Sequence, residues 1–166
     1  MLEVYVLVPV RKSMAMNFLG IFTLVLGIIS LVLSCFSFLF AIPMLILGGI
    51  GILLTFYSRK EYEYSYFDGE VRFAKVMNKS RRKSLGIYSM DEVIQIAPAG
   101  DRSVYKYEND SNLKVKDYSS NISGTPYYDM IVNKDGAMTL IKFEPDEKYL
   151  DAVAVKYPQK LVRRRE

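Results

Sequence analysis

Residues 14–57, MAMNFLGIFTLVLGIISLVLSCFSFLFAIPMLILGGIGILLTFY, form a run of 44 positions without Asp, Glu, Lys, Arg or His. A bilayer core about 30 Å thick needs about 20 apolar residues for each helical crossing, so this run has the length of two crossings. Arg11 and Lys12 precede the run, and Arg59 and Lys60 follow it. The sequence therefore predicts a transmembrane helical hairpin over residues 14–57, followed by a polar tail.

The turn between the two predicted spans is placed by the middle of the run. Small polar residues cluster there, and Pro43, which does not fit inside a regular helix, follows them. We expect a first helix over residues 16–34 and a second over residues 38–57. An alternative puts residues 41–43 in the turn and shortens the second helix.

The charges that flank the run indicate its orientation. Both flanks are basic and the connection between the spans is uncharged, and Lys and Arg accumulate on the cytoplasmic side of membranes. We therefore expect a two-pass protein of the cell (plasma) membrane with both termini in the cytoplasm and residues 1–13 as a cytosolic N-terminal segment. A cleaved signal peptide is disfavoured, because a second span follows the first almost at once.

Glycines mark where a helix of the hairpin comes close to another helix. Gly48, Gly49 and Gly51 form a patch of small residues in the second span. Such a patch lets helix backbones approach closely, either within the hairpin or between copies of the chain. No ionisable residue lies inside the run, which disfavours an ion channel or transporter.

The tail is nearly neutral, although the chain has a net charge of +4. Of the 22 Lys and Arg residues and the 18 Asp and Glu residues, 18 and 17 lie in residues 61–166. A nucleic-acid-binding domain is expected to carry its own basic excess. We therefore expect no nucleic-acid partner and assign the excess at the helix ends to membrane topology.

The residue types needed for several kinds of catalysis are missing. The chain has no His, and its single Cys, Cys35, lies within the apolar run. This composition excludes an intrachain disulfide, a Cys-rich metal site and imidazole acid–base chemistry. We expect a chain that is not an enzyme, with no catalytic residue, cofactor or metal site.

The tail alternates apolar and polar residues with a period of two, which is typical of half-buried strands. The predicted strands are residues 62–66, 71–77, 85–89, 93–98, 113–118, 127–132 and 138–143. Asp68-Gly69 and residues 133–136 are expected to be turns, and residues 78–83 are read as a basic turn. Residues 105–107 fit either a strand or a short helix.

A single helix is predicted after the strands. Pro145 suits a first helical position, and the acidic residues that follow it suit a first turn. Over residues 146–157, one helical face carries Leu150, Val153, Ala154 and Tyr157. We therefore predict an α+β plan: a transmembrane hairpin and then a cytosolic domain over residues 61–158, an antiparallel β barrel or bent sheet with a C-terminal packing helix.

Tyrosines are frequent just after the apolar run. Tyr57, Tyr62 and Tyr64 lie where an aromatic belt at a membrane–water interface is expected.

The residues expected to contact a partner are cations near the membrane segment. Lys79, Arg81, Arg82 and Lys83 are four cations in five residues, and each Lys or Arg near an anionic membrane surface contributes about 1 kcal/mol. The alternative is a solvated turn that serves topology only. Arg163-Arg164-Arg165 in the basic tail, residues 159–166, leaves the same two readings open.

The order of these parts resembles a bacterial pleckstrin-homology-like (PH-like) domain. The similarity is carried by Gly69-Glu70-Val71-Arg72-Phe73, by the basic segment Lys79-Ser80-Arg81-Arg82-Lys83 and by the Ile-rich residues 87–96. The whole chain also resembles a family of small two-pass membrane proteins of unknown function from clostridia-like Gram-positive bacteria. The resemblance implies a fold, and it implies no catalytic residues.

Together these observations favour a membrane-anchored binding or scaffold module. Its cytosolic domain is expected to contact a protein partner or an anionic membrane surface. The alternative is an accessory subunit of a larger membrane complex such as a transporter. Further expected partners are the lipid bilayer and a second copy of the chain, bound through the hairpin.

The orientation is tested by reporter fusions. Reporters placed after residue 2 and after residue 166 should both report a cytosolic location, because matched basic flanks hold both ends on that side. A signal from the outside of the cell at either end would contradict the assignment.

Overall fold

The structure is a computed structural model that describes residues 3–56 and 60–164. The chain divides into two compact units. One unit is residues 11–60, and the other combines residues 1–10 with residues 61–166. The second unit is therefore assembled from two segments that are far apart in the sequence.

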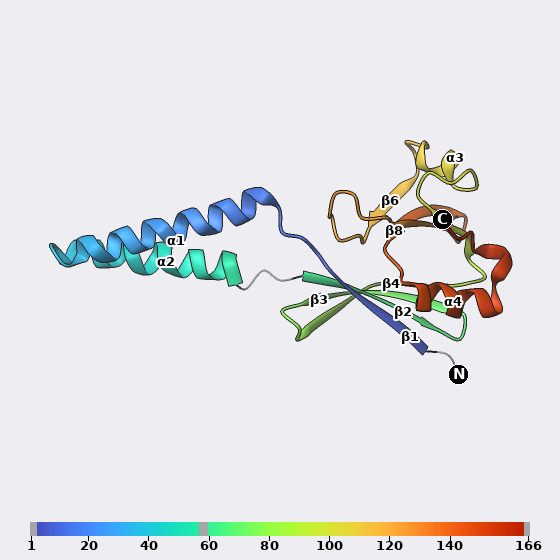
Figure 1. Cartoon of the computed structure of the whole chain (residues 1–166), viewed down its shortest axis with the longest axis horizontal. Helices are drawn as coiled ribbons and strands as arrows, with labels where there is room; N and C mark the ends of the chain where they lie inside the picture. Colours follow the sequence, from blue (N-terminus) through green and yellow to red (C-terminus); the bar gives the residue numbers. More distant parts are fainter. Residues whose placement is uncertain (1–2, 57–59, 165–166) are drawn as a thin grey trace. The chain divides into compact units, whose positions relative to one another are not determined.

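The first unit is a pair of helices. Helix α1 (Met14–Ser34) is followed by a 3-10 turn, η1 (Phe38–Phe40), and by α2 (Ala41–Phe56), which runs back beside α1 (Figure 1). Residues 41–43 form the first turn of α2, where proline is tolerated, so the alternative that placed them in the connecting turn is wrong. Met14–Ser34 and Phe38–Thr55, which combines η1 with most of α2, are long and apolar enough to cross a membrane, by length and composition alone.

Small residues let α1 and α2 approach each other. A Cβ added to Gly27 would lie 3.0 Å from the Gly48 backbone, and one added to Gly51 would lie 2.7 Å from the Leu24 side chain. Lys12 closes the other end of the pair, because its Nζ donates hydrogen bonds to the carbonyl oxygens of Leu54 and Thr55 in the last turn of α2. The start of α1 and the end of α2 therefore lie side by side.

The second unit begins with a four-stranded antiparallel sheet in the order β1-β2-β3-β4. Its strands are β1 (Glu3–Pro9), β2 (Lys60–Phe67), β3 (Glu70–Met77) and β4 (Arg81–Ser89). Residues 3–9 were not predicted to be a strand. They form the edge strand of this sheet and pair with β2 from Glu3 opposite Phe67 to Pro9 opposite Glu61.

The second sheet has the order β5-β7-β8-β6. Its strands are β5 (Val93–Pro98), β6 (Lys114–Asp117), β7 (Tyr128–Lys134) and β8 (Ala137–Phe143). Strand β6 pairs in parallel with β8, whereas the other ladders of this sheet are antiparallel. The α+β class is confirmed, but the two sheets do not close, so the expected barrel is wrong.

The structure decides the secondary structure of two segments that lie between predicted strands. Residues 78–80 are a turn, but β4 already starts at Arg81, so the reading of residues 78–83 as one turn is wrong. Tyr105–Glu108 form the short helix α3, which decides between the strand and the helix left open for residues 105–107.

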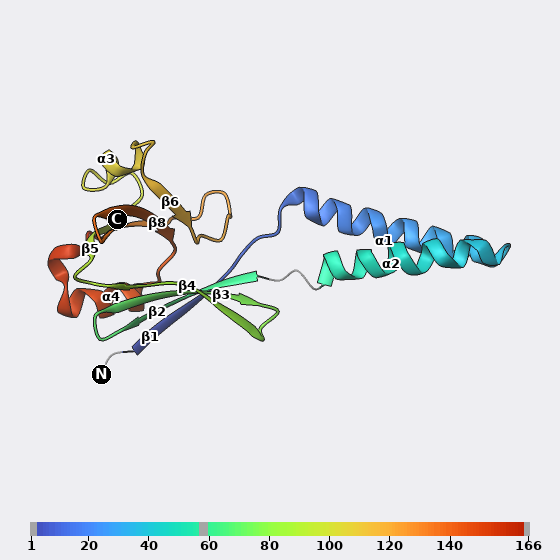
Figure 2. The same cartoon turned by 180° about the vertical axis from the view of Figure 1, so that it is seen from behind.

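The predicted C-terminal helix is α4 (Glu147–Lys156), followed by the 3-10 turn η2 (Pro158–Lys160). Asp146 is its N-cap and accepts a hydrogen bond from the backbone N–H of Tyr149 at 2.8 Å, so Pro145 lies before the helix. Figure 2 shows α4 beside the two sheets. The helix buries Tyr149, Leu150, Ala152 and Val153, whereas Ala154 and Tyr157 are only half-buried.

The core between the sheets is aromatic. Tyr64 and Phe73 from the first sheet meet Phe143 from the second, with ring centroids 5.6–5.7 Å apart and nearly perpendicular planes. Tyr149 of α4 joins them 6.0 Å from Phe143. Tyr64 is fully buried and donates a hydrogen bond to the Tyr118 carbonyl, so its assignment to an interfacial belt is wrong. Tyr62 is half-buried, and Tyr57 lies outside the described residues.

Helix α4 supplies a test of this core. Leu150→Asp would bury an unpaired charge and should lower the free energy of unfolding of the full chain in detergent by several kcal/mol, about 3 or more. Val155→Asp is the matched control, because Val155 lies on the same helix and is 72% exposed. Equal unfolding midpoints for the two variants in denaturant titrations would contradict the packing of α4.

Candidate functional site

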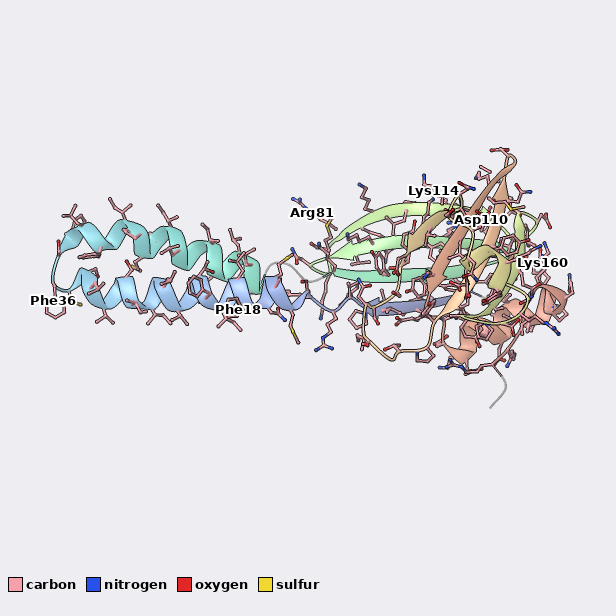
Figure 3. All side chains as sticks on the ribbon, turned by 90° about the horizontal axis from the view of Figure 1, so that it is seen from above. Phe18, Phe36, Arg81, Asp110, Lys114 and Lys160 are labelled. Atoms are coloured by element: carbon pink, nitrogen blue, oxygen red, sulfur yellow. The ribbon has the colours of Figure 1, made fainter. Side chains whose placement is uncertain are left out.

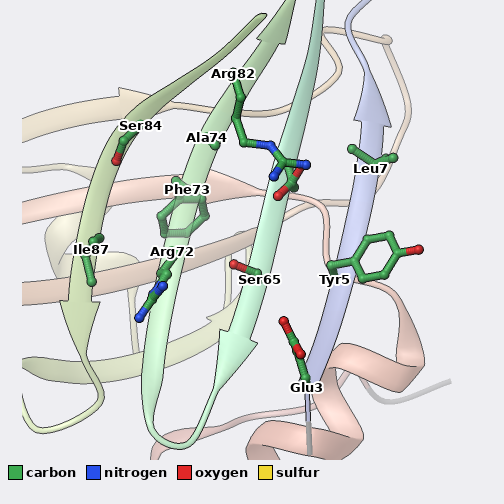
Figure 4. A pocket seen from close by; sticks show the side chains of 11 residues that line it. Glu3, Tyr5, Leu7, Ser65, Arg72, Phe73, Ala74, Arg82, Ser84 and Ile87 are labelled. Atoms are coloured by element: carbon green, nitrogen blue, oxygen red, sulfur yellow. The ribbon is translucent and has the colours of Figure 1, made fainter. Parts of the chain in front are cut away.

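A groove lies on the outer face of the first sheet (Figure 4). Its volume is about 620 Å³. All four strands contribute lining residues: Glu3, Tyr5, Leu7, Glu63, Ser65, Arg72, Phe73, Ala74, Arg82, Ser84 and Ile87. The groove follows from the alternation of side chains along strands, because the opposite face of the same strands packs on the core.

The chemistry of this groove is mixed. Tyr5, Leu7 and Ile87 are 68%, 48% and 47% exposed, which is unusual for apolar side chains on one solvent-facing sheet. Between the apolar residues of β1 and β4 lie the small side chains of Ser65 and Ala74, which leave the sheet hollow. An apolar surface with hydroxyl groups and cations at its rim can bind another amphipathic surface.

Two arginines on the outer face of the first sheet form ion pairs. Arg82 reaches from β4 to Glu63 of β2, with an N–O distance of 2.8 Å, and the Glu63 side chain is only 13% exposed. Arg72 pairs with Glu70 at 2.7 Å, where both side chains are about half exposed. The charge of Arg82 is therefore largely compensated within the sheet.

The four predicted contact residues are not one patch. Lys79 lies in the β3–β4 turn with a left-handed φ of 59°, and it shares the rim of a second outer-face hollow with Arg82. Arg81 and Lys83 alternate with Arg82 along β4 and so point to the opposite face. Lys83 lies opposite Lys75, which adds a cation to this end of the sheet.

All of these cations lie at one end of the first sheet. The end of β3 at Met77 and the start of β4 at Arg81 face each other there (Figure 3). Because the strands are antiparallel, the same end holds Pro9, where β1 ends, and Lys60, where β2 begins. The basic residues therefore surround the two points at which the chain leaves the sheet for the helix pair and returns from it.

The predicted glycines separate into two groups. Gly51 and the backbone of Gly48 lie at the contact between α1 and α2. A Cβ added to Gly48 or Gly49 would meet nothing within 4 Å. Contact within the helix pair therefore explains Gly51, whereas Gly49 is exposed.

Of the C-terminal arginines that the structure describes, Arg163 forms ion pairs. Arg163 forms ion pairs with Asp151 at 2.5 Å and Glu147 at 3.7 Å, both on α4. The backbone N–H of Val162 donates to the Ile96 carbonyl, which fastens this segment to β5. Arg164 is exposed, and Arg165 lies outside the described residues.

A buried acid is the titratable site that sequence reasoning missed. Asp129 on β7 is fully buried, and neither of its carboxylate oxygens accepts a hydrogen bond within the described part of the chain. Burial, and then the neighbouring Glu108 of α3, raise the pKa of Asp129 to about 7, while Lys142 opposes the shift. The one available signal was an acid within the apolar run Tyr128–Val132.

Within residues 3–56 and 60–164, no group of three or more His, Cys, Asp or Glu side chains is arranged to hold a metal ion.

Comparison with known proteins identifies a family. A family model described as a bacterial PH-like domain (DUF6106) matches residues 2–163. No curated protein and no solved structure matches the chain. The match includes β1, the helix pair and both sheets, and it confirms the resemblance to a PH-like domain.

Because Asp129 is buried, we predict that the free energy of unfolding falls as the pH rises. The folded state raises the pKa of Asp129 from 3.8 to about 7, so its stabilising protonated form is lost as the pH rises through that value. Asp129→Asn should remove this dependence and leave the variant more stable than the parent at about pH 8, by about 2 kcal/mol. Denaturant titrations of the full chain at about pH 5 and pH 8 measure the effect. Asp91→Asn, at an exposed position, is the control, and equal pH slopes for the parent and Asp129→Asn would contradict the assignment.

Proposed function

We propose that this chain, which belongs to the bacterial PH-like domain family, is a non-enzymatic membrane-anchored module. Helices α1 and α2 cross the cell membrane with both termini in the cytoplasm. The cytosolic β domain then contacts the anionic membrane surface through the end of the first sheet that carries Lys79, Arg81 and Lys83.

The observation that carries this proposal is the shared location of anchor points and cations. Pro9 and Lys60 lie at the same sheet end as the β3–β4 turn. Four residues, 10–13, separate β1 from α1 and span at most about 14 Å when fully extended. A membrane that contains α1 therefore lies within reach of this end of the sheet.

The charge distribution supports the same surface. Lys79, Arg81 and Lys83 are exposed and have no ion pair within the described residues, whereas Arg82 is paired with Glu63. Arg11 and Lys12, close in sequence to α1, add to the positive charge beside the anchor. Since each such cation contributes about 1 kcal/mol near an anionic surface, three of them give a reversible contact.

A second candidate function is that of an accessory subunit in a larger membrane complex. It is favoured by Gly49, which contact within the helix pair does not explain. A small residue on the outer side of a membrane helix permits close approach of another helix. Affinity capture from solubilised membranes tests this alternative, since stoichiometric recovery of a polytopic protein would favour it.

The lipid contact is tested with the full chain, because a fragment that starts at residue 61 would lack β1. A Cys35→Ala, Ser80→Cys chain carries a fluorophore in the β3–β4 turn and is reconstituted in nanodiscs with a headgroup quencher. We expect quenching in discs that contain phosphatidylglycerol, weaker quenching in discs of phosphatidylcholine alone, and loss of the difference in 1 M salt, where the Debye length is about 3 Å.

Two triple variants complete the design. Replacing Lys79, Arg81 and Lys83 by Gln should abolish the lipid-dependent quenching. Replacing the exposed cations Arg102, Lys106 and Lys114 by Gln removes the same charge elsewhere on the domain and should leave the quenching unchanged. Equal loss in both variants, or quenching that ignores lipid charge, would refute the proposed surface.

A further inference from the structure

We propose that the outer edge of β1 pairs with β1 of a second copy of the chain, so that two first sheets join into one continuous eight-stranded antiparallel sheet. This inference goes beyond the proposed contact with lipid and does not depend on it. It rests on the hydrogen-bonding pattern, the side chains and the symmetry of residues 3–9.

The backbone of β1 leaves one row of polar groups without a partner. Pro9 has no N–H, and proline on an edge strand keeps its nitrogen on the unpaired side. We therefore infer that its pair with Glu61 is a non-hydrogen-bonded one and that the even-numbered residues form the ladder to β2. Glu3, Tyr5 and Leu7 therefore direct their N–H and C=O groups away from β2. Within the described residues, no other backbone or side-chain group hydrogen-bonds to them.

Helix α4 contacts β1, but the strand itself has few of the features that keep exposed edges apart. It is seven residues long, it carries no Lys, and its proline stands at the last position. Tyr5 and Leu7 are exposed on the outer face, and Val4 and Val6 are only half-buried on the inner face. A paired strand would cover apolar surface on both faces and satisfy the free backbone groups.

The sequence of β1 is complementary to itself. Read in antiparallel about Val6, Glu-Val-Tyr-Val-Leu-Val-Pro places Tyr5 opposite Leu7 of the second copy and Val4 opposite its Val8. Val6 faces its own counterpart, and Glu3 faces Pro9, so no like charges are opposed. The hydrogen-bonded pairs in this register are those between Tyr5 and Leu7, whose backbone groups are the free ones.

The pair has two-fold symmetry. The two-fold axis of an antiparallel strand pair runs perpendicular to the sheet, so both copies present the same sheet face to the same side. An extended segment of a different protein would use the same hydrogen bonds but would not account for the self-complementary side chains.

Cysteine cross-linking of the full chain in isolated membranes tests the register. In a Cys35→Ala background, Val6→Cys should form a disulfide-linked dimer on mild oxidation, because non-hydrogen-bonded partners have Cα atoms about 4.5 Å apart, within the range of a disulfide. Val4→Cys and Val8→Cys alone should stay monomeric, since equivalent residues are then about 14 Å apart along the strands. Co-expression of these two variants should restore the linked dimer.

A proline variant distinguishes the contribution of the backbone N–H groups from that of the side chains. Leu7→Pro removes an outward N–H without touching the ladder to β2 and should abolish the Val6→Cys dimer, whereas Leu7→Ala keeps the N–H and should retain it. Circular dichroism and the thermal midpoint of both variants show whether the domain is folded. A monomeric Val6→Cys chain, cross-linking of Val4→Cys alone as strong as that of Val6→Cys, or a mixed disulfide with another protein would overturn the proposal.

Discussion

The pairing of β1 with β2 is the constraint on which the rest of the architecture depends. The two strands are neighbours in the sheet, yet the whole helix pair is inserted between them in the sequence. A flexible connection of that length would add loop-closure entropy to the pairing. Here α1 and α2 run side by side and Lys12 joins the start of α1 to the end of α2, which brings the described ends of the connection together. The anchor thus becomes part of the domain's own topology, and removing it by truncation at residue 61 would remove an edge strand as well.

The aromatic core explains why two open sheets remain together. Tyr64, Phe73 and Phe143 meet edge to face across the sheets, and Tyr149 brings α4 into the same cluster. Such contacts add to the free energy of burying large apolar side chains. Asp129 departs from this apolar packing because it is a buried carboxyl group. Its burial beside Glu108 favours the protonated acid, so the second sheet carries a built-in sensitivity to pH near neutrality.

Both proposals, lipid contact and strand pairing, concern the first sheet. The groove on its outer face is apolar at Tyr5, Leu7 and Ile87, and two arginines there are paired with Glu63 and Glu70. Lys79, Arg81 and Lys83 lie at the sheet end that holds Pro9 and Lys60. The proposed lipid contact uses the sheet end that holds Pro9 and Lys60, whereas the proposed strand pairing uses the outer edge of β1.

Local signals in the sequence determined the elements, and the tertiary structure determined how distant residues combine. The uninterrupted apolar run predicted the helix pair, the turn before Gly136 predicted the β7–β8 hairpin, and the acidic start at Asp146 predicted α4, because each depends on neighbouring residues alone. The place of β1 in the sheet, the open sheets with parallel β6, and the fully buried Asp129 depend on contacts between segments far apart in the chain. Composition likewise located the basic residues, but only strand alternation and Glu63 decided which of them remain unpaired, because an ion pair is a property of three-dimensional proximity.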